Sequence, residues 1–226
     1  MANIFTGSIG KKFVMSISGL FLILFLTMHT VINSISIVSK EAFNAACDFM
    51  GSPIVSIMVP ILALGFIIHI IYATVVTIGD LKARGGLNRY ASGSKAKTDS
   101  WAARNMIILG IIILGFLAFH FYHFWLHMQY QLFTGGEVCP DPYGLLLTTF
   151  GKPWITALYI VWFVALWFHL THGFWSAFSH IGWNNDKWLP RLKVIAYIVA
   201  TLLCGALATV AIVNCLRFNG ILPSIA

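Results

Sequence analysis

The sequence predicts an all-α membrane protein built as a bundle of five transmembrane helices. Of its 226 residues, 59% are hydrophobic and only 9% are charged, whereas a soluble domain has about 25% charged residues. A helix needs roughly 20 apolar residues to cross a hydrocarbon core. Apolar runs of this length occur five times, at about 13–37, 54–79, 105–128, 154–178 and 191–216. Barrel strands would be shorter and would alternate polar with apolar residues.

The first apolar run follows Lys11 and Lys12, which is also how a cleaved signal peptide begins. The run is longer than the apolar region of a signal peptide, and no small-x-small cleavage site follows its core. We therefore expect a retained first helix. No internal repeat divides the chain, so residues 1–226 are expected to form a single domain.

Basic residues gather in alternate connections between the runs. The first connection balances Lys40 against Glu41 and Asp48, and the third balances Lys152 against Glu137 and Asp141. The basic residues before the first run and in the second and fourth connections are Lys11, Lys12, Lys82, Arg84, Arg89, Lys95, Lys97, Arg104, Lys187, Arg191 and Lys193. By the positive-inside rule, the N-terminus is expected in the cytoplasm and the C-terminus outside. The net charge of +7 thus indicates a membrane topology and no nucleic-acid partner.

Proline and glycine mark the expected breaks. Gly85-Gly86 is expected to interrupt the polar loop 80–104, and "GGEVCPDPYG" at 135–144 is expected to form turns. Pro60 is expected to kink the second span one to two turns after its start. Cys47 and Cys139 both fall in expected outer connections, where a disulfide and two free thiols are both compatible with the sequence.

Histidine occurs inside four of the five apolar runs, where an ionisable residue is a functional hypothesis by default. A single histidine in such a run can instead be a packing residue that makes a hydrogen bond. The pattern of all the histidines together therefore decides between a packing role and a functional role. At 1.5 Å per residue, His29 and His120 lie in the outer half of the membrane, and His69 and His169 lie in the inner half. The four histidines therefore form two pairs by depth, each joining two helices.

Two bis-histidine haems stacked in a helix bundle need this arrangement, because each haem iron takes two axial imidazoles. A structural zinc ion needs four ligands close together, and neither level offers a nearby cysteine or carboxylate. A proton relay usually includes a buried carboxylate, and none lies well inside the runs.

On the third and fourth spans, a second histidine close to the first leaves undecided which of the two would bind iron. His123 follows His120 by three residues and His172 follows His169 by three, so either member could bind iron while the other packs or binds a propionate or a quinone. His180 stands about 16 Å beyond His169, within reach of a propionate of the inner haem. An ordinary hydrogen-bonding role fits each of these neighbours as well.

Several stretches resemble one known family. "SIGKKFVMSISGLFLILFLTMHTVIN" at 8–33, with Ser18-Gly19 and His29 ten residues later, resembles the first helix of the dihaem cytochrome b anchor of succinate dehydrogenase and fumarate reductase. "FIIHIIYA", "FHFYHFW" and "FHLTHGFW" continue the likeness in order. It covers essentially the whole chain and implies one polypeptide with five transmembrane helices.

The resemblance implies which residues hold the haems. The ligands would be His29, His69, His120 and His169, with the first helix paired to the third and the second to the fourth. The family pattern of a histidine, three residues and a glycine selects His169, with Gly173 as the glycine, over His172, and the third-span pattern favours His120 over His123. Ser16 matches a position that contacts haem propionates, and His180 falls where some relatives carry a basic residue for this purpose.

The sequence departs from the family at two positions. Some menaquinol-linked relatives carry a glutamate two residues before the fourth-span ligand, where this chain has Trp167. They also carry a quinone-site glutamate just before the second span, which aligns near Met50. The nearest carboxylates are Asp48 and Glu41, and Asp48 is taken as the candidate quinone residue. A transmembrane proton path like that of those relatives is not expected.

The resemblance implies an electron-transfer subunit, not an enzyme on its own. It would hold two haem b groups in the inner (cytoplasmic) membrane, surrounded by lipid, and would pass electrons between an iron–sulfur subunit and a quinone, with menaquinone favoured. A flavoprotein subunit and the iron–sulfur subunit would dock on the cytoplasmic face. The alternatives are a dihaem cytochrome b of a hydrogenase or formate dehydrogenase, a His-lined transporter of metal ions or protons, and a haem-free anchor.

Overall fold

The computed structural model describes residues 7–83, 100–136 and 139–225, and all regular elements within them are helices. Five stretches are long and apolar enough to cross a membrane. They are Ile9–Ile35, Pro53–Gly79, Met106–Met128, Pro153–His180 and Trp188–Phe218. The five expected spans are thus confirmed to within a few residues. The expected break at Gly85-Gly86 and the side chains of Arg84, Arg89, Lys95, Lys97 and Glu137 lie outside the described residues.

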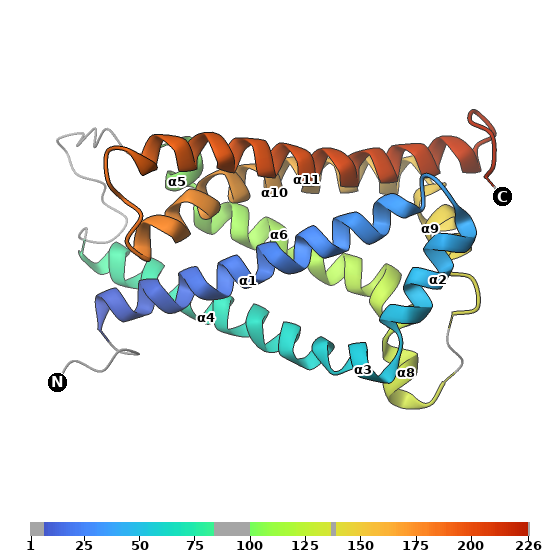
Figure 1. Cartoon of the computed structure of the whole chain (residues 1–226), viewed down its shortest axis with the longest axis horizontal. Helices are drawn as coiled ribbons and strands as arrows, with labels where there is room; N and C mark the ends of the chain where they lie inside the picture. The colour runs from blue at the N-terminus through green and yellow to red at the C-terminus, as the bar shows by residue number, and fades with distance from the viewer. Residues whose placement is uncertain (1–6, 84–99, 137–138, 226) are drawn as a thin grey trace.

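The long helices run side by side along the molecule (Figure 1). They are α1 (Ser8–Ile35), α4 (Met58–Ala83), α6 (Met106–His120), α10 (Pro153–His180) and α11 (Trp188–Phe218). A π-helical turn, η1 (Phe121–Trp125), and α7 (Leu126–Met128) continue α6. The short helices are α2 (Lys40–Met50), α3 (Pro53–Ser56), α5 (Trp101–Arg104), α8 (Tyr130–Thr134) and α9 (Pro142–Phe150).

Helix α10 is the centre of the bundle, because it packs against α1, α6 and α11. Ala196 and Ala200 of α11 are completely buried one turn apart, and small residues at such an interface let two helix backbones approach closely. Helix α4 packs chiefly on α1. A Cβ atom at Gly65 would lie 2.6 Å from Cε1 of Phe21, so this contact requires glycine.

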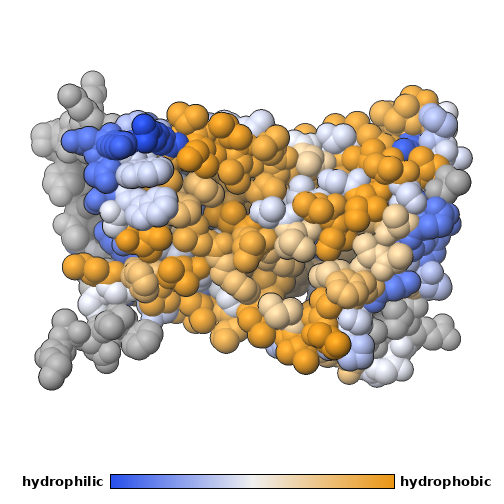
Figure 2. Space-filling model, viewed as in Figure 1, coloured by the Kyte–Doolittle hydropathy of each residue, from blue (hydrophilic) through white to orange (hydrophobic). Residues whose placement is uncertain are grey.

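The two ends of the bundle are polar and its middle is apolar. Figure 2 shows the hydrophobic residues as a broad band between hydrophilic ends. Helices α2, α3, α8 and α9 and the C-terminus lie at one end, and the start of α1 lies at the other (Figure 1). The first is called the outer end below and the second the inner end. The start of α1 and the end of α11 therefore lie at opposite ends of the bundle.

One of the two expectations about breaks is wrong in detail. The stretch expected to form turns holds the start of α9, because Pro142 follows Asp141 and proline is favoured at the first helical position. The expected disruption of the second span by Pro60 takes the form of a break in the preceding turn, where α3 ends at Ser56 and α4 begins at Met58. Pro60 has no N–H to donate to the Ser56 carbonyl, so the ladder is interrupted there.

Candidate functional site

The structure brings together the two histidine pairs that depth selects. The ring centres of His29 and His120, the outer pair, lie 5.8 Å apart with an angle of 83° between ring planes. Those of His69 and His169, the inner pair, lie 6.5 Å apart at 72°. All four side chains are partly buried. Each pair thus joins helices that are distant in the sequence.

The two pairs occupy separate levels of the bundle. On α1, Ser18 contacts the inner pair, and it precedes His29 of the outer pair by about three turns, or ~16 Å. On α10, Tyr159 contacts the outer pair, and it precedes His169 of the inner pair by about three turns as well. Two independent helices therefore give the same separation between the levels.

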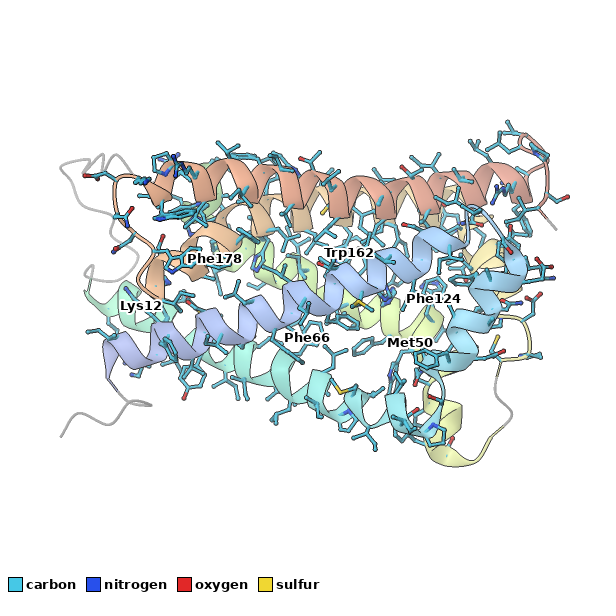
Figure 3. All side chains as sticks on the ribbon, in the orientation of Figure 1. Lys12, Met50, Phe66, Phe124, Trp162 and Phe178 are labelled. Carbon is cyan, nitrogen blue, oxygen red and sulfur yellow. The ribbon has the colours of Figure 1, made fainter. Side chains whose placement is uncertain are left out.

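Each pair joins two helices that are not direct backbone neighbours. Helix α1 packs on α4 and α10, and α6 packs on α10. The helices that carry a pair, α1 with α6 and α4 with α10, have little backbone contact with each other. The imidazoles therefore face one another across the interior of the bundle, which is where helix bundles hold cofactors. Figure 3 shows Phe66, Phe124 and Trp162 among the side chains between these ribbons.

The inner pair is seated on α1 by a serine and a glycine. The Ser18 hydroxyl lies 3.2 Å from Nδ1 of His69 and donates to the Met15 carbonyl at 2.9 Å. A Cβ atom at Gly19 would lie 3.3 Å from Cε1 of His69, so only glycine leaves this ring its full room. Nδ1 of His169 is buried without a hydrogen-bond partner.

The outer pair has polar neighbours on α1 and α10. The Tyr159 hydroxyl lies 3.5 Å from Nδ1 of His120. The Asn33 amide donates to the His29 carbonyl at 2.8 Å and lies 3.3 Å from Nε2 of His29. The ring centre of Trp162 is 5.7 Å from that of His120, and its buried Nε1 has no hydrogen-bond partner. Polar atoms with unmet hydrogen bonds thus stand beside both pairs.

His123 stands apart from the pairs because of the π-helical turn. This turn begins directly after His120 and contains His123, and π turns inside α-helices are frequent at functional sites. Nδ1 of His123 hydrogen-bonds the Phe119 carbonyl at 3.0 Å, and its ring centre lies 4.1 Å from that of Phe119. His123 therefore bonds to its own helix while His120 faces His29.

The other candidate residues on the inner side separate into two places. His172 packs on Trp175, with ring centres 4.9 Å apart. Nδ1 of His180 lies 3.4 Å from the Ser16 hydroxyl, which also donates to the Lys12 carbonyl at 2.8 Å. The structure thus brings Ser16 and His180 together near the inner end, where Figure 3 places Lys12.

A pocket of about 120 Å³ opens at the outer end. Its lining residues are Cys47, Asp48, Gly51, Met128, Gln129, Cys139 and Pro142. The Gln129 Oε1 atom is buried without a hydrogen-bond partner. Cys47 and Cys139 are free thiols. Burial, assisted by Asp48 and Cys139, raises the pKa of the Cys47 thiol to about 12, so this thiol stays protonated at neutral pH.

Several of these neighbours escaped sequence reasoning. Asn33 follows His29 by four residues, the spacing at which helical side chains meet, so its contact was open to prediction. Tyr159 and Trp162 carry no such signal, because they reach His120 from another helix. Gln129 gives no signal either, since the outer pocket is assembled from separate segments.

The histidines of this site meet in pairs. Within residues 7–83, 100–136 and 139–225, no three His, Cys, Asp or Glu side chains meet closely enough to hold a metal ion. In comparisons with known protein families, curated proteins and solved structures, no family, protein or structure matches the chain.

Proposed function

We propose that the chain is the dihaem cytochrome b membrane anchor of a succinate dehydrogenase or fumarate reductase, an electron-transfer subunit and not an enzyme on its own. The distance within each histidine pair carries this proposal. Two imidazoles on opposite sides of one metal, each bound at about 2 Å, hold their ring centres roughly 6 Å apart. The ring centres here lie 5.8 Å and 6.5 Å apart.

The surroundings of the pairs fit haem better than other cofactors. A porphyrin supplies four ligands, so two histidines complete the iron, whereas a zinc ion would need two more protein ligands. Each pair joins helices with little backbone contact, and the absence of a Cβ atom at Gly19 leaves room beside the His69 ring. His29 fits with one adjustment. Its Nε2 is 3.3 Å from the Asn33 amide, which must turn away if this nitrogen binds iron.

Each residue then has a specific task. His29 and His120 would ligate the outer haem b, and His69 and His169 the inner one. Ser16 and His180, 3.4 Å apart, would bind a propionate of the inner haem. When bound, the haems supply one-electron carriage between the two ends of the bundle, with potentials set by ligands, hydrogen bonds and burial. His123 and His172 would stand in the second layer, beside the ligands.

The outer pocket is the proposed quinone site, with Asp48 as its carboxylate. At about 120 Å³ it is smaller than the ~300 Å³ at which typical ligand pockets begin, so it would take a ring head group and leave the tail in lipid. By resemblance the quinone is menaquinone. The flavoprotein and iron–sulfur subunits would dock at the inner end, on the cytoplasmic face of the inner membrane.

Haem stoichiometry tests the proposal. The purified chain should give a b-type spectrum, reduced minus oxidised, with close to two haems per chain. One haem per chain would mean that one pair does not bind iron. Well-folded protein without haem would overturn the proposal and favour the transporter or the plain anchor. Co-purification of a flavoprotein would separate this reading from a hydrogenase or formate dehydrogenase cytochrome.

A further inference from the structure

Ser18 joins the backbone of α1 to the imidazole of His69. The side chain is buried, with 7% of its surface exposed. Its oxygen lies 2.9 Å from the Met15 carbonyl oxygen and 3.2 Å from Nδ1 of His69. Both distances are within hydrogen-bond range. The serine thus sits between an atom that can only accept and an atom that can either donate or accept.

The donor and acceptor inventory fixes the direction of these bonds. A serine hydroxyl has one hydrogen to donate and a carbonyl oxygen has none. The shorter contact, to Met15, therefore uses the hydroxyl hydrogen. The contact with His69 then requires a hydrogen on Nδ1 of the imidazole. In a neutral imidazole this leaves the lone pair on Nε2.

We propose that Ser18 is a positioning residue that holds His69 as the Nδ1–H tautomer and so presents Nε2 as a ligand. The inference deepens the proposed function, because the ligand it prepares is that of the inner haem. A hydrogen bond from the second ring nitrogen fixes the tautomer and orientation of a ligating histidine and raises its basicity. His169, the other member of the pair, has no partner for Nδ1. The inner pair is therefore held from one side, the side of α1.

The predicted consequence is a shift in the potential of one haem. A more basic imidazole favours the oxidised iron, so loss of Ser18 should raise the potential of the inner haem. In a redox titration of the full chain, Ser18→Ala should shift the reduction equilibrium of one haem about tenfold, which is ~59 mV for one electron. The other haem should be unchanged. Ser18→Thr keeps the hydroxyl and should restore the wild-type value.

Ser34→Ala is the matched control. Ser34 lies on the same helix and donates to the Thr30 carbonyl at 2.8 Å, so its substitution removes a similar backbone bond without touching the His69 ring. Equal shifts in Ser18→Ala and Ser34→Ala would overturn the inference, as would unchanged potentials in Ser18→Ala. Loss of one haem in Ser18→Ala that Ser18→Thr restores would support it.

A second measurement works without haem. In ¹⁵N-histidine NMR of the full chain in bilayers before haem loading, with the His69 signal assigned by its absence in His69→Gln, wild-type His69 should be the Nδ1–H tautomer. Ser18→Ala should lose this preference. An Nε2–H tautomer in the wild type would overturn the inference. If the wild type binds no haem, the proposed function fails, while the NMR result still decides the role of Ser18.

Discussion

His169 and His172, three residues apart on α10, are both candidates for the proposed inner ligand, and their contacts in the structure differ. His169 faces His69 with ring centres 6.5 Å apart, whereas His172 packs on Trp175. His169→Ala should therefore reduce the haem content from about two to about one per chain. His172→Ala, the matched control, should keep both haems. Haem and protein quantification measures this, and a single haem in His172→Ala with two in His169→Ala would reverse the assignment.

A larger side chain at Gly19 provides a second, purely steric test of the inner pair. A Cβ atom there would lie 3.3 Å from Cε1 of His69, so a branched side chain would displace the ring. Gly19→Val should lower haem binding at the inner pair by about 10-fold or more, as loss of support around a metal ligand does. Gly110→Val on α6 is the control, since a Cβ at Gly110 meets nothing within 4 Å. Equal haem content in both variants would contradict the proposed packing of the His69 ring against Gly19.

At the residue scale, the sequence predicted the positions of the four histidines better than it predicted the residues that contact them. The four histidines could be sorted by depth because an α-helix rises by a constant 1.5 Å per residue. Spacing alone left His120 and His123 open and the family resemblance favoured His120; the π-helical turn that separates the two rings has no recognisable sequence signal. The hydrogen bond between His69 and Ser18 could not be predicted either, because it depends on how closely α1 and α4 approach.

Among the elements, α2 and α9 form a clamp at the outer end. The Asn44 amide nitrogen donates to Asp141 at 3.0 Å, and its oxygen accepts from the Tyr143 N–H at 2.9 Å. Lys40 lies 3.5 Å from the other Asp141 oxygen. The Asn44 hydrogen bond, with help from the Gly144 N–H and Lys40, holds the pKa of Asp141 below its usual value of 3.8.

This clamp should depend on pH. Because folding lowers the pKa of Asp141, its contribution to stability is present above pH ~4 and is lost as the pH falls through the folded value. Asn44→Ala should therefore destabilise the protein by about 1 kcal/mol at pH 7 and by less below pH ~4. Thermal unfolding at both pH values measures the difference. Asn105→Ala, which loses a bond within its own turn, should show no such dependence, and a pH-independent loss in Asn44→Ala would contradict the assignment.

The elements that hydropathy could predict are the long ones. The five spans emerged because a membrane requires about 20 apolar residues in a row. Helices α2 and α9 are short, and their stability comes from contacts that the sequence does not display, such as buried Phe43 of α2 against Tyr143 of α9. The start of α9 was hidden for a related reason. Asp-Pro is typical of turns and of helix starts alike, and only the packing of the outer end selects the helix.

For the whole molecule, the arrangement of charge follows the arrangement of helices. The described basic residues of the second and fourth connections include Lys82, Arg104 and Lys187. They lie toward the inner end, where α4 ends and α11 begins (Figure 1). Trp188 and Trp175 lie there too, with Arg191 5.6 Å from one ring centre and Lys193 5.0 Å from the other. Such aromatic and basic side chains suit a membrane interface. This end is therefore the one expected to face the cytoplasm.

Reporter fusions test that orientation. A fluorescent protein folds and fluoresces only in the cytoplasm, whereas alkaline phosphatase is active only outside it. A fusion at Trp183 follows four crossings and a fusion after the C-terminus follows five, so the two should give opposite signals. We expect fluorescence at Trp183 and phosphatase activity at the C-terminus, because basic connections stay in the cytoplasm. The reverse pattern would place the outer pocket and Asp48 in the cytoplasm, and the soluble subunits would then have to dock at the opposite end from the one proposed.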